Sequence, residues 1–234
     1  MTKAPSSAFL QCIFLFCNLE EPALFSSLGS TGFASGNTLE QAKVSALLEV
    51  IERHHEATMP MDISTCFRFV SSHKGIAPLL TAYEYENVAL QFQDITGPMG
   101  IPCCRCFVVD QAGTIQKGAA ASLSAKKAII SAITETTYPF PHSPSSQSGP
   151  DDLLVVDYDN LPDYATGDPV SDLNLLETLL IQNNYRPYYI DLTRKDIGLP
   201  VVKAIVPGMD IIGDFDDYSR VHGELFRNYL TLFK

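Results

Sequence analysis

The chain contains one pattern twice, and the two copies begin 86 positions apart. In each copy a small-residue loop leads to a hydroxyl residue that can cap a helix, and a glutamate follows that residue eleven positions later. The copies are residues 32–49, capped at Thr38, and residues 118–135, capped at Ser124. An internal repeat indicates a fold built from copies of one unit. Each glutamate therefore occupies the same place in its unit and is a candidate for a shared site.

A second repeated pattern begins at two aspartates that lie 97 positions apart. Each copy has an Asp-x-Thr triplet, a Gly-x-Pro triplet and an apolar stretch, which are Asp94–Thr96, Gly100–Pro102 and 103–108, then Asp191–Thr193, Gly198–Pro200 and 201–206. This order predicts a strand, a Gly/Pro-punctuated connection and a second strand. Together with the expected helices, the repeats favour an α+β fold. We expect mixed sheets covered by helices and built from repeated strand–strand–helix units.

Four helices and one further strand are predicted from spacing and capping. The longest helix, residues 38–58, begins at a capping box formed by Thr38 and Gln41, and Pro60 stops it soon after its end. The other expected helices are 75–85, 124–138 and 171–183, and the further strand is 88–95.

Two segments stand apart from this pattern. Residues 1–25 contain an apolar run that Gln11 interrupts and that is too short to span a membrane. We expect a buried strand there, and a signal peptide is the alternative. Residues 139–150 are rich in proline and serine and predict an exposed, mobile loop. The remainder, residues 26–234, is expected to form one domain.

Composition narrows the classes of partner. The net charge is −11 and no cluster of lysine or arginine occurs, so nucleic acid is an unfavourable partner, and no membrane partner is expected. The six cysteines match neither a disulfide framework nor a zinc site. Buried free thiols, and hence a reducing compartment such as the cytoplasm, are expected.

The longest predicted helix carries a polar stripe on an otherwise mostly apolar surface. At 100° per residue, five side chains fall within an arc of roughly 80°, namely Gln41, Ser45, Glu49, Glu52 and Glu56. Stacked glutamates repel one another, and a divalent cation would remove that repulsion. The alternative is an amphipathic helix whose glutamates are simply solvated, with His54 and His55 as structural or solvated histidines.

A glycine-rich loop, residues 29–37, precedes this helix. Such a loop exposes backbone N–H groups at the positive end of the helix dipole, which suits a phosphate group. In the second copy, Glu135 is the only acid on a helix of small and apolar residues. Its equivalence to Glu49 favours a shared role in a site that contains a nucleotide and a metal ion.

These residues resemble the signature of the YcaO-type family of ATP-dependent enzymes that modify peptide backbones. The resemblance rests on Gly36–Ala42, on Leu48–Arg53 with its Glu-x-x-Glu-Arg motif, on Ala128–Glu135, on Tyr189–Thr193 and on Gly198–Met209. It covers roughly residues 26–234.

The resemblance implies ATP and Mg²⁺ as cofactors and a peptide or protein as substrate. Family members phosphorylate a peptide amide oxygen, and attack by a side chain or by sulfide then gives an azoline or a thioamide. By the resemblance, Asn37 would contact the phosphates, Glu49 and Glu52 would hold magnesium, and Arg53 would counter the phosphate charge. Glu135 would complete the nucleotide cleft.

The sequence also departs from the family pattern. Gln41 stands where the family usually has a second acid, so it would bind the cofactor through one neutral carbonyl, and Tyr138 stands where a glutamine is common. The family's amino-terminal ATP-binding segment and proline-rich carboxyl tail do not match within the chain. Half an ATP site predicts weak or no turnover, unless a partner protein or a homo-oligomer completes the site. The alternatives are a non-catalytic binding or scaffolding module, and an unrelated α/β protein without a nucleotide site.

Overall fold

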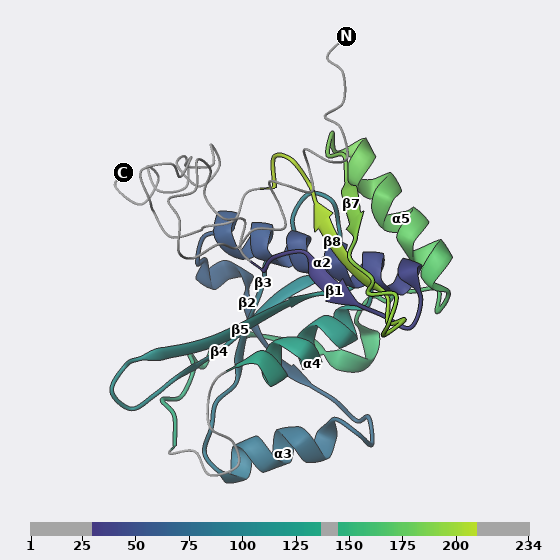
Figure 1. Cartoon of the computed structure of the whole chain (residues 1–234). Coiled ribbons are helices and arrows are strands. Elements are labelled where there is room, and N and C mark those ends of the chain that lie inside the picture. The colour runs from purple at the N-terminus through teal and green to yellow at the C-terminus, as the bar shows by residue number, and fades with distance from the viewer. Residues whose placement is uncertain (1–29, 137–144, 210–234) are drawn as a thin grey trace, which may run out of the picture. The chain divides into compact units, whose positions relative to one another are not determined.

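A computed structural model describes residues 30–136 and 145–209 of the chain (Figure 1). The chain divides into two compact units, one formed by residues 1–58 with 176–234 and the other by residues 59–175. The strand expected within residues 1–25, the loop at 139–144 and the carboxyl-terminal tail lie outside the described residues.

The unit of residues 59–175 is built on a five-stranded sheet in the order β5-β4-β3-β2-β6. The strands are β2 (Cys66–Val70), β3 (Gln91–Asp94), β4 (Cys103–Val109), β5 (Ile115–Ala121) and β6 (Leu154–Asp157). Only β6 runs parallel to its neighbour β2, and the other pairs are antiparallel. Its helices are α3 (Ala77–Tyr85) and α4 (Ala125–Glu135), with short 3₁₀ turns η1 (Ile63–Thr65) and η2 (Tyr158–Asn160).

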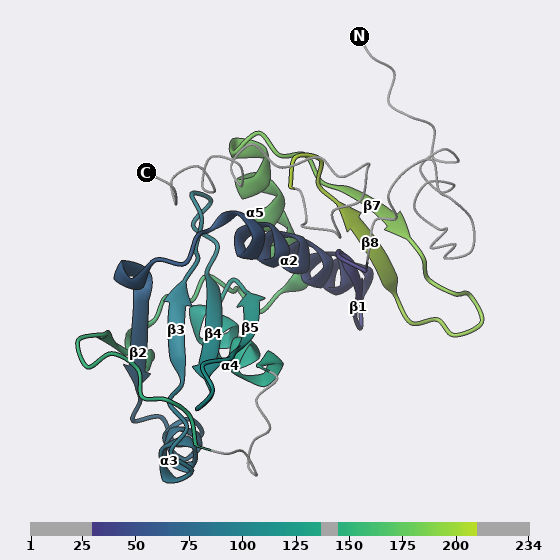
Figure 2. The same ribbon diagram turned by 90° about the vertical axis from the view of Figure 1, so that its left-hand side faces the viewer.

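The core of this unit lies between the sheet and α4 (Figure 2). Apolar residues at helical spacing on α4, namely Ala128, Ile129, Ala132 and Ile133, are all nearly fully buried. They pack with the strand residues Phe67, Phe69, Phe92, Cys104, Cys106 and Ala120. The spacing of small and branched residues on α4 therefore determines which helix face covers the sheet.

The other unit contains a three-stranded sheet in the order β1-β8-β7. Its strands are β1 (Phe33–Ser35), β7 (Tyr188–Asp191) and β8 (Val201–Ile205), and both pairs are antiparallel. The long helix α2 (Leu39–Thr58) packs against β1 and β8 (Figure 1). Helix α5 (Pro169–Gln182) crosses the boundary between the units at residue 176.

The hydrogen bonds confirm the internal repeat. Asp94 accepts the backbone N–H of Thr96 at 2.8 Å, and Thr96 Oγ1 accepts the N–H of Cys103 at 3.1 Å. The second copy repeats these bonds, with the Thr193 N–H on Asp191 at 2.9 Å and the Val201 N–H on Thr193 at 3.1 Å. Each copy therefore joins two antiparallel strands, β3 with β4 and β7 with β8, through the same pair of local hydrogen bonds.

The repeated hairpins differ in the burial of their loops. Gly100 and Gly198 both adopt φ of 72° at the same position, which favours glycine. Next to this glycine, Ile101 is fully buried in the first copy, whereas Leu199 is 47% exposed in the second. The two turns thus share the same local geometry, but the residue after the glycine is buried in the first and exposed in the second.

Several predicted boundaries need correction. The two small-residue loops are strands in part, because β1 occupies residues 33–35 of the first loop and β5 extends through residue 121 of the second. Each strand pairs with an antiparallel neighbour, which overrides the low strand propensity of glycine and alanine. The helix expected at 124–138 ends at Glu135, and the helix expected at 171–183 begins at Pro169. The strand expected at 88–95 is shorter, at 91–94.

Part of the predicted mobile loop is bound to the sheet. The Ser146 hydroxyl accepts the Ala89 N–H at 2.7 Å, and the Gln147 N–H donates to the Val109 carbonyl at 2.8 Å. Residues 145–147 therefore lie along the ends of β3 and β4 rather than free in solvent.

Cys66, Cys103, Cys104 and Cys106 are free and buried, as the sequence predicted. Burial raises the pKa of the Cys106 thiol to about 12 and also raises the pKa of Cys104. A raised pKa keeps a thiol protonated at pH 8. Relative to an ordinary cysteine, we expect alkylation of native Cys106 to be slowed roughly a thousandfold.

Mass spectrometry after iodoacetamide labelling measures this protection, with the urea-unfolded chain as the fully reactive control. The raised pKa and the buried position predict little labelling of Cys106 until the pH approaches 12 or the chain unfolds. Rapid labelling of native Cys106 at pH 8 would contradict its burial.

Candidate functional site

The polar stripe lies on α2, a helix whose opposite face is buried. Ala42, Ala46, Leu47 and Ile51 are fully buried, which fixes the rotation of the helix about its axis. The stripe then changes in environment along the helix, because Ser45 is exposed, Glu49 is half-buried and Glu52 is 8% exposed. The carboxylates at its carboxyl-terminal end are therefore the most shielded from water.

The start of α2 has the predicted capping box in a modified form. Thr38 Oγ1 accepts the Gln41 N–H at 3.1 Å, and Gln41 Oε1 accepts the N–H of Asn37 at 2.9 Å. The side chain of Gln41 thus ties down the loop residue that precedes the cap. Its carbonyl oxygen serves the helix start, while its role in binding a cofactor stays a prediction.

Replacing Gln41 with leucine is expected to destabilise the chain by about 0.5–1 kcal/mol, because the Asn37 N–H loses its acceptor at an exposed helix start. Glutamate at the same position keeps the acceptor and places a negative charge at the positive end of the helix dipole. Gln41→Glu is therefore expected to equal or slightly exceed the wild type in stability. Urea unfolding of the three chains measures the order, and equal stability of leucine and glutamine would show that the bond contributes nothing.

Glu52 and Glu56 share one cation, Arg53. The Arg53 Nε lies 3.6 Å from Glu52 Oε1, and its Nη1 lies 3.7 Å from Glu56 Oε2. Arg53 partly neutralises the stacked carboxylates, and its predicted role in countering phosphate charge stays a prediction. At these distances the ion pairs are weak and readily rearranged.

Glu49 and Glu52 are the best candidates for ligands of a divalent cation. They lie three residues apart on one helix, a spacing that puts Cβ atoms about 5–6 Å apart. Mg²⁺ is commonly held by one or two carboxylates, with waters and substrate phosphates completing its shell. Within residues 30–136 and 145–209, no three His, Cys, Asp or Glu side chains converge to hold a metal ion by themselves. Two carboxylates are the number that commonly hold Mg²⁺ together with a phosphate, so Glu49 and Glu52 as magnesium ligands stay a prediction.

The helix start and the carboxylate pair are separate parts of the candidate site. At 1.5 Å rise per residue, Gln41 and Glu49 are about 12 Å apart along α2. One magnesium ion with ligands at about 2.1 Å cannot join them. A ligand that contacts both Asn37 and the glutamates must be extended along the helix.

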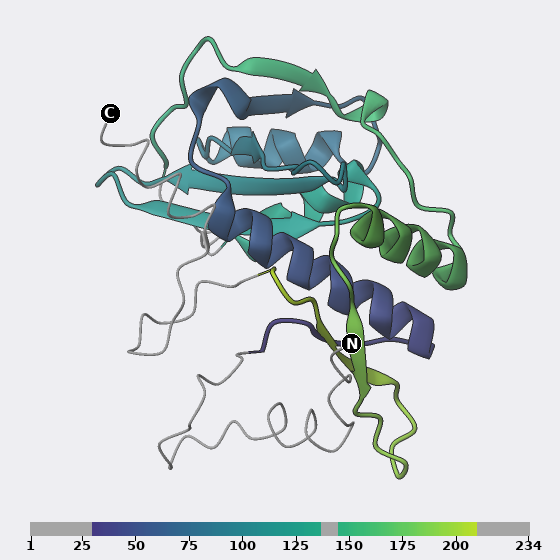
Figure 3. The same ribbon diagram turned by 90° about the horizontal axis from the view of Figure 1, so that it is seen from above.

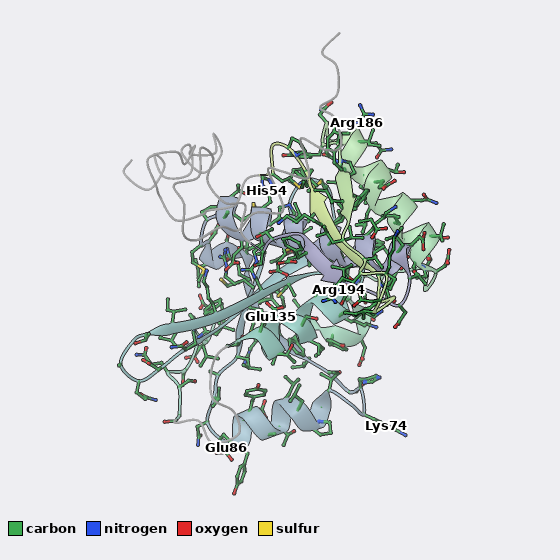
Figure 4. The ribbon with its side chains drawn as sticks, in the orientation of Figure 1. His54, Lys74, Glu86, Glu135, Arg186 and Arg194 are labelled. Carbon is green, nitrogen blue, oxygen red and sulfur yellow. The ribbon has the colours of Figure 1, made fainter. Side chains whose placement is uncertain are left out.

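Glu135 is the last residue of α4 and is exposed, as Figure 4 shows for its labelled side chain. A carboxylate at a helix carboxyl terminus faces the negative end of the helix dipole, so helix stability does not explain its presence. Glu135 belongs to the unit of residues 59–175, whereas the other predicted site residues all belong to the other unit.

The two repeated helix starts differ in access. The N–H of Ala125 at the start of α4 donates to the Pro162 carbonyl at 3.0 Å, and Leu123 beside it is 3% exposed. At the start of α2, Asn37 and Thr38 are exposed. Of the two repeats, the α2 start is therefore the more exposed, and the N–H groups of Asn37 and Gln41 there already have side-chain acceptors.

Sequence reasoning missed two buried cations. Lys203 on β8 is 3% exposed, donates to the Thr31 carbonyl and lies 4.1 Å from the Phe33 ring centre. Arg105, at the equivalent position of β4, is 7% exposed and donates to Gln93 Oε1 at 2.6 Å. The signal was a charged residue in the middle of each apolar strand, at matching places in the repeat.

The two histidines of α2 are buried, so they are not solvated, which was one of the two expected possibilities. His54 and His55 are 4% and 2% exposed. The His54 ring lies 6.0 Å from that of Tyr185 in an edge-on arrangement, and Figure 4 marks His54 on α2.

The fold and the stripe together define an α+β chain with a carboxylate pair suited to magnesium on a largely buried helix. The family model described as YcaO cyclodehydratase, ATP- and Mg²⁺-binding, matches residues 10–142 and 136–210. The chain belongs to the YcaO family. This match removes the possibility that the chain is an unrelated α/β protein.

Solved structures show the same fold. A heterocyclase in complex with substrate and cofactor and the heterocyclase TruD each give a TM-score of 0.64 over 87% of this chain, at 23% and 24% identity. YcaO from Methanopyrus kandleri, bound with AMPPCP and Mg²⁺, gives a TM-score of 0.61 over 85% of this chain at 17% identity.

The chain spans only part of these proteins, namely 30% and 32% of the two heterocyclases and 60% of the Methanopyrus protein. A curated relative from Methanothermobacter thermautotrophicus, described as an uncharacterized protein, is 25% identical over 232 residues. That alignment covers 81% of this chain and 57% of the relative. No helix in the described part of the chain is long and apolar enough to cross a membrane.

Proposed function

We propose that the chain contributes to ATP- and Mg²⁺-dependent activation of a peptide backbone amide, as a YcaO-like cyclodehydratase or thioamidation protein. The observation that carries the proposal is the pair Glu49 and Glu52, placed on one face of a buried helix with Glu52 only 8% exposed. Shielded carboxylates of this kind gain from a divalent cation, because the cation relieves their mutual repulsion.

ATP, when bound, would supply the phosphoryl group that turns the amide oxygen into a leaving group. The amide oxygen would form a bond to the terminal phosphorus as the bond to ADP breaks. A side-chain thiol or hydroxyl of the peptide, or a separate sulfide ion, would then displace the phosphate. In this proposal Glu49 and Glu52 hold magnesium and Asn37 contacts a phosphate at the α2 start. Arg53 turns from the glutamates toward phosphate charge, Gln41 orients the loop, and Glu135 completes the cleft.

A non-catalytic binding or scaffolding module is the second candidate. The observation that favours it is Gln41, whose carbonyl oxygen accepts the Asn37 N–H, so that position supplies no acid to a cofactor. Such a module would bind a peptide or partner protein without consuming ATP. A partner subunit or a second copy that completes the site fits either proposal.

Isothermal titration of the full chain with ATP tests the proposal, run once with Mg²⁺ and once with EDTA. We expect micromolar binding that needs Mg²⁺, because the carboxylates contact phosphate only through the cation. Release of phosphate from ATP in the presence of peptide would then distinguish the enzyme from the module. Absence of heat at millimolar ATP with Mg²⁺ would overturn the nucleotide proposal for this chain alone and leave the scaffolding function.

A further inference from the structure

The strand β6 forms one edge of the five-stranded sheet. It pairs in parallel with β2, from Phe67 opposite Leu154 to Val70 opposite Asp157. Figure 3 shows β6 as the green strand at the rim of this sheet. Within the described residues no strand pairs with its outer side, so the outward backbone N–H and C=O groups are open to another strand.

The strand β6 is short and ends at the charged Asp157, but its first three residues, 154–156, carry neither a charge nor a proline. Natural proteins place charges, proline or bulges there to prevent pairing with another chain. Residues 153–156 are instead Leu-Leu-Val-Val, and Leu154 and Val155 are 65% and 45% exposed. Val70 on the neighbouring strand adds a third exposed apolar side chain, at 53%.

The opposite edge of the same sheet differs. β5 carries Gln116 and an exposed Lys117 in its outer half, followed by glycine and alanines. A lysine on an edge strand is one of the common protections against strand addition. The β5 edge of the sheet therefore carries a protective charge, whereas the β6 edge is mainly apolar.

Acidic residues lie at both ends of β6. Asp151 and Asp152 precede β6, and Asp157 and Asp159 end it or follow it, and all four are exposed. Ser72 donates its hydroxyl and backbone N–H to Asp159, and these bonds lower the pKa of that carboxyl group. Two cations lie near the strand: the exposed Arg68 pairs in register with Val155, and Lys126 donates to the Asp159 carbonyl at 2.9 Å.

We propose that the outer edge of β6 accepts an extended peptide by strand addition, with apolar side chains at the centre of the peptide and lysine or arginine at its ends. Backbone pairing would supply the affinity, and the aspartates at both ends of β6 would favour peptides with basic residues at their ends. As a docking site for a substrate peptide, this inference rests on the proposed function.

Fluorescence anisotropy with the full chain tests the proposal in the absence of nucleotide. The probe is a labelled synthetic peptide of alternating valine and threonine with two lysines at each end. A version with N-methyl groups on alternate backbone nitrogens keeps the side chains and blocks backbone pairing. We expect saturable binding of the first peptide, and affinity at least about tenfold weaker for the N-methylated peptide and for one with glutamates at its ends.

Leu154→Lys is expected to weaken binding about tenfold or more, because it places a charge on the open edge. The matched control is Ile115→Lys, which changes a side chain of similar exposure, 54%, at the other edge of the same sheet and should bind as the wild type does. Asp152→Asn should weaken binding severalfold at low salt and have less effect at high salt. This variant preserves a test if Leu154→Lys does not fold.

Equal binding of the plain and N-methylated peptides, or of wild type and both the Leu154 and Asp152 variants, would overturn the proposal. A concentration-dependent dimer of the wild type that Leu154→Lys converts to monomer would overturn it in favour of a second copy at this edge. Because no nucleotide is present, failure of ATP binding leaves this result standing. Conversely, failure of peptide binding leaves the ATP titration unaffected.

Discussion

Glu52→Gln is expected to weaken binding of ATP with Mg²⁺ at least about tenfold relative to the wild type. Glutamine has nearly the shape of glutamate, so the helix packing around α2 is preserved while the charge is lost. Mg²⁺ binds carboxylate oxygen far better than a neutral amide. Because Glu52 is 8% exposed, water cannot fully replace the lost charge, and the effect should be large.

The matched control is Glu40→Gln, which removes the same charge from the first turn of the same helix. Glu40 lies outside the polar stripe, so its replacement should change ATP affinity less than about twofold and stability by a few tenths of a kcal/mol. Titration calorimetry at constant ionic strength compares the three chains. If both variants lost affinity equally, the effect would be general charge and the stripe would not be a metal site.

Gly118→Ala is expected to destabilise its unit by about 3 kcal/mol, the upper range for overpacking in a tight core. A Cβ at Gly118 would lie 2.5 Å from the Ala132 oxygen and the Thr136 nitrogen and 2.6 Å from the Glu135 carbonyl carbon. These are backbone atoms at the end of α4 and cannot move aside without shifting the helix. The same change would displace Glu135, because its carbonyl carbon is one of the contacting atoms.

Gly75→Ala is the control, because its Cβ would meet only the His73 ring at 3.5 Å, an ordinary contact distance. We expect this variant to unfold in urea within about 0.5 kcal/mol of the wild type. Unfolding of Gly118→Ala at the wild-type urea concentration would show that β5 and α4 are less closely packed than their backbone atoms indicate.

The features that the sequence predicted well are those set by local chemistry. The capping box at Thr38, the Asp-x-Thr and Gly-x-Pro turns and the apolar face of α2 all depend on neighbours within a few residues. Each reappears in the structure at the predicted place. The Asp-x-Thr repeat was visible for the same reason, since both of its copies use the same local bonds. The repeated cap was wrong in part, because the Thr38 hydroxyl caps α2 whereas the Ser124 side chain makes no capping hydrogen bond at the start of α4.

The features that were missed depend on contacts between distant segments. Gly118 and its alanine neighbours have low strand propensity, and only pairing with β4 makes them a strand. The contact of Gly118 with the end of α4 could not be read from spacing. Lys203 is likewise buried by residues far away in the sequence, because it donates to the Thr31 carbonyl and lies over the Phe33 ring.

Under the proposed function, the unequal helix starts predict how many nucleotides one chain binds. Although the unit occurs twice, the Pro162 carbonyl occupies the start of α4, while the start of α2 is exposed at Asn37 and Thr38. The two repeats therefore share the order of strand and helix, β1 with α2 and β5 with α4, but differ in the exposure of the helix start. If the chain binds ATP at the start of α2, we expect one ATP per chain, because the start of α4 is covered by the Pro162 carbonyl.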